Sequence, residues 1–163
     1  MIKQTLLVLL SISIGLWPHQ ANKLVFGSVM NPISVSDFQI TIIFFPQEDF
    51  LTIMFLFNLD NISHKRIFSE IQFILSNMPD SRIKLIGISK GDTRKFLQLQ
   101  GEINSNVHLV NDRRDEIFNR FEYVCGMCIK ILLVDKHCKL RFVASNFDPL
   151  FLREIIMRYD KEE

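Results

Sequence analysis

The feature that most constrains this chain is an alternation of short apolar runs with amphipathic segments. Four of the runs are rich in β-branched and other apolar residues, which is typical of strands buried in a sheet. They cover residues 39–45, 82–89, 106–112 and 129–135. Such strands need helices on both faces, so the alternation predicts a parallel core of strands covered by helices.

The segments between the runs have the spacing of amphipathic helices. We expect helices over residues 65–77, 91–103, 113–123 and 148–159. Asp92 is a suitable N-cap for the second helix. In the last helix, Asp148 stands at the N-cap and Pro149 at the first helical position, and both residues favour a helix start there.

Two further segments complete the predicted fold. Residues 50–59, "FLTIMFLFNL", are apolar on every side, so they predict a deeply covered helix. Residues 139–145 follow the run 129–135 after a tight turn and predict its antiparallel partner. The order β-α-β-α-β-α-β-β-α predicts an α/β three-layer sandwich. It has a mixed central sheet, an antiparallel C-terminal hairpin and flanking helices.

The N-terminus differs from the rest of the chain. One lysine precedes residues 5–17, which carry no charge, and the polar stretch "PHQANK" follows. This pattern predicts a signal peptide or N-terminal hydrophobic segment over residues 1–21 and export to the bacterial periplasm or cell envelope. The run is shorter than the roughly 20 residues of a membrane span. The alternative is a buried N-terminal element. We expect an extension over 22–37 and one folded domain over 38–163.

Composition narrows the possible partners. The formal net charge is +1 and the basic residues are scattered, so no nucleic-acid partner is predicted. The fifteen phenylalanines indicate core filling. No phosphate loop, G-x-S-x-G or H-E-x-x-H pattern occurs, and no cofactor is predicted. The expected partner is an unidentified envelope protein. Membrane association is expected only through the N-terminal segment, where that segment is uncleaved.

The element order resembles the thioredoxin-like superfamily. It is closest to the redoxin branch of peroxiredoxins and exported TlpA/ResA-like thiol-disulfide oxidoreductases. "IKILLVDKHCKLRFV" looks like the family's "P-t-t-f-l-i-D-x-x-G-k-i-v", and "NVHLVND" stands where the branch has an extra strand. The resemblance covers roughly residues 38–159 and implies a redoxin-type fold.

The sequence departs from the family at its diagnostic positions. In the family, a C-x-x-C follows the first core strand and opens the first helix, where the helix N-terminus stabilises a thiolate. With 39–45 as that strand, Phe50 and Ile53 occupy the two cysteine positions. The family's cis-proline falls at about Ile129, and the turn glycine is replaced by Cys138. The resemblance therefore implies a degenerate redox centre.

Cys125 and Cys128 form a C-x-x-C elsewhere in the chain. In this fold the segment before the cis-proline position lies against the first helix, so the pair is expected near the vacated site at Phe50. Three interpretations stay open, namely a redox pair, a structural disulfide, or inert thiols. A zinc site that adds His137 and Cys138 is disfavoured, because a strand over residues 129–135 separates the two groups.

Two functional hypotheses follow. The first is an exported redoxin-like protein that lacks the usual redox centre and acts as a binding or structural module. It predicts an exposed apolar patch that includes Phe50, Phe55 and Phe57. The second is a thiol-disulfide oxidoreductase in which Cys125 and Cys128 are the catalytic residues. The second hypothesis requires the two Cα atoms to lie about 4.4–6.8 Å apart.

Overall fold

The computed structural model describes residues 25–31, 33–36, 42–78, 82–103, 107–124 and 128–161. The apolar run and the proposed signal segment lie outside these residues, so export stays a prediction. No helix in the described part of the chain is long and apolar enough to span a bilayer.

A five-stranded mixed sheet forms the centre of the molecule. Its strands are β3 (Leu51–Leu56), β4 (Ile83–Ser89), β5 (Val107–Asn111), β6 (Lys130–Val134) and β7 (Leu140–Ala144), in the spatial order β5-β4-β3-β6-β7. The strands β3, β4 and β5 run parallel, whereas β6 is antiparallel to both β3 and β7. The predicted parallel core and C-terminal hairpin are confirmed.

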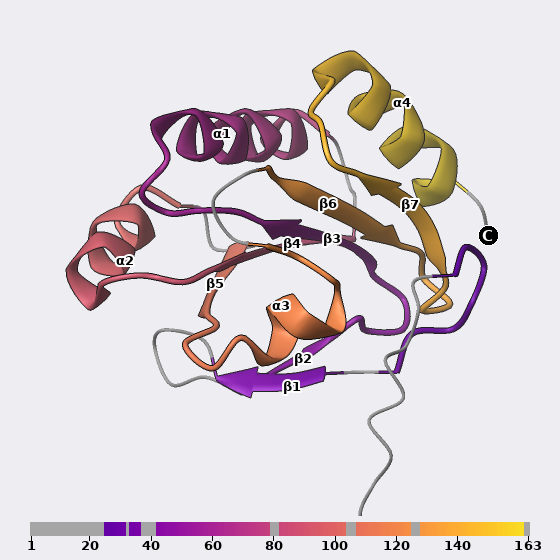
Figure 1. Cartoon of the computed structure of the whole chain (residues 1–163). Coiled ribbons are helices and arrows are strands. Elements are labelled where there is room, and N and C mark those ends of the chain that lie inside the picture. Colours follow the sequence, from indigo (N-terminus) through magenta and orange to yellow (C-terminus); the bar gives the residue numbers. More distant parts are fainter. Residues whose placement is uncertain are drawn as a thin grey trace, which may run out of the picture.

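Helices cover both faces of this sheet. They are α1 (Ile62–Ser76), α2 (Thr93–Gln100), α3 (Glu116–Arg120) and α4 (Pro149–Asp160). Figure 1 shows α1 and α4 over one face and α3 over the other, which gives the predicted three layers. A separate antiparallel pair, β1 (Ile33–Ser36) and β2 (Ile42–Phe45), lies beyond α3.

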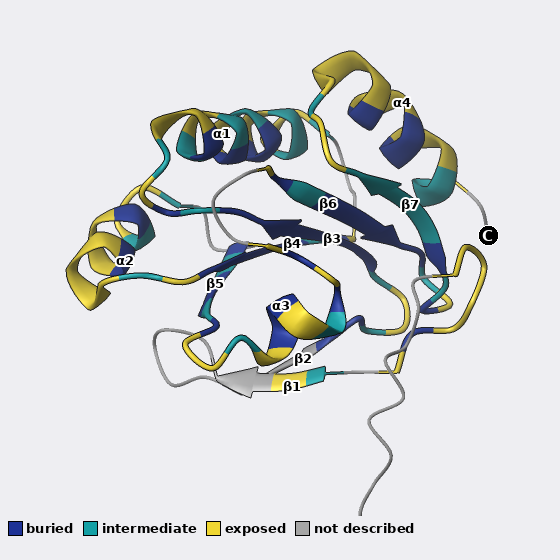
Figure 2. Cartoon of the chain, viewed as in Figure 1, coloured by how far each residue is buried: buried dark blue, intermediate teal, exposed yellow. Residues whose placement is uncertain are grey.

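Strand residues alternate between two hydrophobic cores, one on each face. In β3, Ile53 and Phe55 pack towards α1 and α4, whereas Met54 and Leu56 pack towards α3. The same alternation occurs in β6, where Ile131 faces the first core. A strand that packs against two cores is apolar at most positions. β3 is accordingly buried along its length, and β6 is buried from Ile131 to Val134 (Figure 2).

Most predicted helices and caps are confirmed. Asp92 accepts a hydrogen bond from the Arg94 N–H at 2.6 Å and caps α2. Asp148 caps α4, with Pro149 as its first residue. The first helix starts at Ile62, three residues before the predicted start, and α3 is shorter than predicted.

Two predictions in the N-terminal half are wrong. The run 39–45 does not supply the first core strand, because β2 pairs only with β1 in the small separate sheet. The first core strand is β3, within the segment that was predicted to be a covered helix. A strand that is apolar on both faces has no alternation, so its pattern resembles that of a buried helix.

Candidate functional site

The carboxyl ends of β3, β4 and β5 meet at one edge of the sheet, which we call the α1 edge because α1 begins there. In open α/β sheets this edge is the usual place for ligand sites. The loop after β3 leads through Asn58 and Asn61 into α1, and Ser89 ends β4. The amino end of β6 lies at the same edge, since Leu56 pairs with Lys130.

Asn61 caps the first turn of α1. Its side-chain oxygen accepts hydrogen bonds from the Ser63 N–H at 2.9 Å and the His64 N–H at 3.3 Å. These are two of the N–H groups that a helix leaves unpaired at its start. The cap therefore uses donors that could otherwise stabilise an anion at this position.

His64 is buried three residues further on and is held in one tautomer. Its Nδ1 accepts a hydrogen bond from the Asn58 N–H at 3.1 Å, so the proton of the neutral ring is on Nε2. Burial lowers the pKa of His64 below its ordinary value of 6.5. The hydrogen bond to Nδ1 acts in the same direction, because a protonated ring could not accept it. His64 is a neutral anchor of the loop at pH 7.

Ser89 joins the ends of β3 and β4. Its hydroxyl donates to the Phe57 carbonyl at 2.8 Å and accepts from the Leu59 N–H at 2.9 Å. The side chain is fully buried, so both bonds form away from water. The loop that enters α1 is thus held to the end of β4 by Ser89 and to the first turn of α1 by His64.

The end of β5 is fixed by a carboxylate. Asp112 accepts hydrogen bonds from the backbone N–H groups of Glu116, Ile117 and Phe118 at 2.8–3.0 Å, which anchors the start of α3. Burial raises the pKa of Asp112, and these hydrogen bonds oppose the increase. Asp112 therefore holds the start of α3 against the end of β5.

The structure corrects the positions assigned to the family's cysteines. Phe50 precedes β3, where Lys84 Nζ lies 4.1 Å from the centre of its ring, and Ile53 is buried inside β3. Neither residue opens a helix. In this fold the two positions that open the first helix after the first core strand are Asn61 and His64. The predicted positions were wrong because the first core strand is β3 and not the run 39–45.

The predicted apolar patch is also wrong. Phe55 and Phe57 are fully buried and stack with Phe68 of α1, at centroid distances of 5.7 and 5.2 Å. Phe50 is only half-buried and lies beneath Lys84. The rings of Phe55, Phe57 and Phe68 form the core between β3 and α1 and offer no surface to a partner.

Of the predicted cysteine pair, Cys128 lies among the described residues and Cys125 lies outside them. Cys128 is exposed, and its carbonyl accepts a hydrogen bond from the Tyr123 hydroxyl at 2.8 Å. It precedes β6, so the antiparallel register places it beside the loop that enters α1. The expected proximity to Phe50 is wrong, because Phe50 lies at the opposite end of β3. Whether Cys128 pairs with Cys125 stays a prediction.

The third cysteine cannot join this pair. Cys138 is buried in the β6–β7 turn, where it adopts a φ of 59° at the position of the family's turn glycine. Burial, followed by the charges of Glu48 and Asp135, raises the pKa of the Cys138 thiol. At about 3.3 Å per residue, β6 alone separates Cys138 from Cys128 by about 13 Å, well beyond disulfide reach.

The β6–β7 turn is organised by Asp135. Its carboxylate accepts from the His137 N–H at 2.9 Å, the Lys139 N–H at 2.8 Å and Arg141 Nε at 2.5 Å. Burial alone would raise the pKa of Asp135. The hydrogen bonds from Lys139, Arg141 and His137 more than offset this effect and hold the pKa below its usual value. An ionised aspartate therefore organises this turn, at the position where the family's pattern also has an aspartate.

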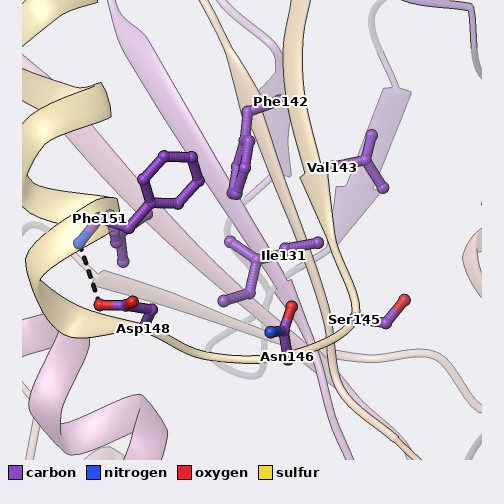
Figure 3. A pocket seen from close by; sticks show the side chains of 9 residues that line it. Ile131, Phe142, Val143, Ser145, Asn146, Asp148 and Phe151 are labelled. Carbon is purple, nitrogen blue, oxygen red and sulfur yellow. Dashed lines mark hydrogen bonds between the residues drawn. The ribbon is translucent and has the colours of Figure 1, made fainter.

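Two hollows lie beside these elements. One, of about 340 Å³, lies between β7 and the start of α4. In Figure 3 the rings of Phe142 and Phe151 form one wall, with Ser145 and Asn146 below. The other, of about 370 Å³, lies between α1 and α2 and is lined by Lys65 among others. Among the described residues, no group of three His, Cys, Asp or Glu side chains could hold a metal.

Solved structures resemble this chain closely in fold. Thiol peroxidase from Chromobacterium violaceum matches with a TM-score of 0.66 and 16% identity, over 82% of this chain and 87% of that chain. A putative protein disulfide isomerase from Bacteroides thetaiotaomicron matches at 0.67 and 15%, over 86% and 92%. A putative thiol:disulfide interchange protein DsbE from Chlorobium tepidum matches at 0.67 and 10%, over 83% and 95%.

The fold is that of the thioredoxin-like redoxins. No family model and no curated protein matches the sequence, so the likeness is one of structure. The resemblance inferred from the element order is confirmed. At identities of 10–16%, these matches show the fold alone. The chemistry has to be inferred from the residues at the site.

Proposed function

We propose that this chain is an exported redoxin-fold protein of the bacterial cell envelope that acts as a binding or structural module. In this reading it lacks the thiol centre that the fold carries at the start of its first helix. The observation that supports the proposal is that α1 opens with Asn61 and His64 and has no cysteine in its first turn.

The chemistry of these two side chains supports a structural role. An asparagine amide and an imidazole cannot form or exchange a disulfide. Both groups are already engaged, Asn61 with two backbone N–H groups and His64 with the Asn58 N–H. The helix start is therefore filled with bonds that stabilise the loop.

The alternative is a thiol-disulfide oxidoreductase that uses Cys125 and Cys128. One observation favours it, namely that Cys128 is exposed and lies beside the loop that enters α1. In that reaction one thiolate would attack a substrate disulfide and form a mixed disulfide. The second thiol would then release the reduced substrate and leave a Cys125–Cys128 disulfide.

A redox titration with thiol trapping and mass readout tests the proposal. Wild type, Cys125→Ser and Cys128→Ser are equilibrated with glutathione buffers and then alkylated. We expect no reversible pair between about −270 and −120 mV, the range of known oxidoreductases. A Cys125–Cys128 disulfide that titrates in this range, and is absent from both variants, would establish the alternative instead.

A further inference from the structure

Three exposed apolar side chains lie close together in the segment Val25–Val29, which we call the N-terminal loop. Val25, Phe26 and Val29 are 53%, 64% and 64% exposed. Single exposed apolar residues are ordinary, but three within five residues form a local patch. The question is what covers this patch.

The loop is held firmly against the end of the sheet. The Gly27 N–H donates to the Leu140 carbonyl at 2.8 Å, and the Leu140 N–H donates to the Ser28 carbonyl at 3.1 Å. The Met30 N–H donates to the Cys138 carbonyl at 2.7 Å, and the Met30 side chain is buried in the core below α3. The apolar side chains are thus presented at a fixed place.

The preceding sequence indicates the partner. Residues 5–17 form an uncharged apolar run, and only residues 18–24 separate that run from the patch. Seven residues reach at most about 25 Å when fully extended. If the run is inserted in a bilayer, the N-terminal loop must lie within that distance of the membrane surface.

We propose that the N-terminal loop docks on a lipid bilayer, with Val25, Phe26 and Val29 entering the region between headgroups and acyl chains. This inference rests on the proposed export and on the apolar run remaining attached to the domain. Phenylalanine and aliphatic side chains suit this depth, which is about 5–10 Å for interfacial segments.

The charges around the loop indicate that the contact is mainly apolar. The β6–β7 turn carries Lys136 and Lys139, and Val29 pairs with Lys139. The acidic residues Glu48 and Asp49 lie beside the same turn, since the Asp49 N–H donates to the Lys136 carbonyl at 3.1 Å. Because the two signs balance, docking does not require anionic lipid.

The proposed docking sets the orientation of the domain. The N-terminal loop lies at the β6–β7 turn, whereas the start of α1 and the amino end of β6 lie at the other end of the central strands (Figure 1). With the turn at the membrane, the α1 edge faces the aqueous phase. A partner in solution could then reach it.

Site-specific fluorescence tests the docking. The chain has one tryptophan, Trp17, so Trp17→Phe provides a silent background. Phe26→Trp is the reporter, and Phe73→Trp is the control, because Phe73 is 71% exposed on α1. Each full-length variant is reconstituted into phosphatidylcholine vesicles with or without brominated acyl chains. We expect brominated lipid to quench the Phe26→Trp emission and to leave the Phe73→Trp emission unchanged.

Other results would overturn the docking. Equal quenching at both positions would indicate unspecific adsorption. Absence of quenching in protein that floats with the vesicles would indicate an anchor without docking. Protein that does not float at all would remove the membrane contact, and its intact mass would show whether residues 1–21 had been cleaved. The thiol titration is independent of these outcomes, so failure of the docking is distinguishable from failure of the proposed module.

Discussion

The two ends of the central strand pair β3–β6 are built from different chemistry. At the β6–β7 turn, an ionised aspartate, Asp135, gathers two backbone N–H groups and the Arg141 guanidinium. At the α1 edge, the neutral side chains of Asn61, His64 and Ser89 hold the loop. The turn has an aspartate where the resembling family has one, whereas capping and loop hydrogen bonds hold the α1 edge. The difference indicates that the turn depends on one charged side chain, whereas the α1 edge depends on several neutral ones.

The largest expected effect is at the charged end. Asp135→Ala removes the acceptor for the His137 and Lys139 N–H groups and leaves the half-buried Arg141 without its carboxylate. We expect the free energy of unfolding to fall by about 3 kcal/mol, because breaking a largely buried pair leaves an uncompensated charge. Urea denaturation measures this loss.

The matched control is an exposed ion pair. Glu154 and Arg158 lie on α4 with their charged atoms 3.9 Å apart, and both side chains are exposed. Glu154→Ala should change the unfolding free energy by less than about 0.5 kcal/mol. A loss of similar size in both variants would show that Asp135 contributes no more than a surface charge.

At the neutral end, Ser89→Ala should cost about 2 kcal/mol. The change leaves the Phe57 carbonyl and the Leu59 N–H without their shared partner in a fully buried place. Ser69→Ala is the control, since the Ser69 hydroxyl bonds to the Lys65 carbonyl on the exposed face of α1. If the two variants proved equally stable, the buried Ser89 bridge would not contribute to stability at this edge.

The sequence predicted most of the C-terminal half of the fold, because its signals are local. The caps Asp92 and Asp148 mark helix starts, and the apolar runs 82–89 and 129–135 become β4 and β6. The prediction of the N-terminal half was wrong where two apolar runs follow one another. Residues 39–45 and 50–59 are both largely apolar without a clear alternation, and periodicity cannot distinguish a strand buried on both faces from a buried helix.

That single misassignment displaced the candidate site. It moved the expected cysteine positions to Phe50 and Ile53, whereas α1 opens at Asn61 and His64. Asn61 was a usable signal, since asparagine is a preferred N-cap and an amphipathic pattern follows it. The roles of His64 and Ser89 could not be predicted, because each depends on a contact between segments that only the fold brings together.

Acid should affect the two ends in different pH ranges. The pKa of His64 is lowered from 6.5, so the unfolded chain binds the extra proton and stability falls as pH drops below about 6.5. The pKa of Asp135 is also lowered, so its contribution is full above about 3.8 and is lost only below that pH. Asp112, whose pKa is raised, acts in the opposite sense, because the folded chain takes up its proton at a higher pH than the unfolded chain.

His64→Gln separates these ranges. The glutamine oxygen can still accept the Asn58 N–H but does not titrate, so the decline in stability below about pH 6.5 should flatten. One proton changes stability by at most about 1.4 kcal/mol per pH unit, which sets the largest slope to expect. Urea denaturation at several pH values measures it. A wild-type decline that persists unchanged in the variant would assign the upper range to another group.

The placement of the family's cysteine positions can be tested directly by restoring them. In a Cys125→Ser, Cys128→Ser background, Asn61→Cys with His64→Cys places two thiols one helical turn apart, about 5–6 Å between Cβ atoms and close enough for small adjustments to bring them within disulfide reach. Phe50→Cys with Ile53→Cys is the control, because three residues of extended chain span about 10 Å. Thiol trapping should find a reversible disulfide only in the first variant. The start of α1 would then stabilise a thiolate at these two positions, where the present Asn61 and His64 side chains carry no thiol. A disulfide in the control variant alone would return the vacated site to Phe50 and Ile53, and the contrast between the two ends of the sheet would no longer hold.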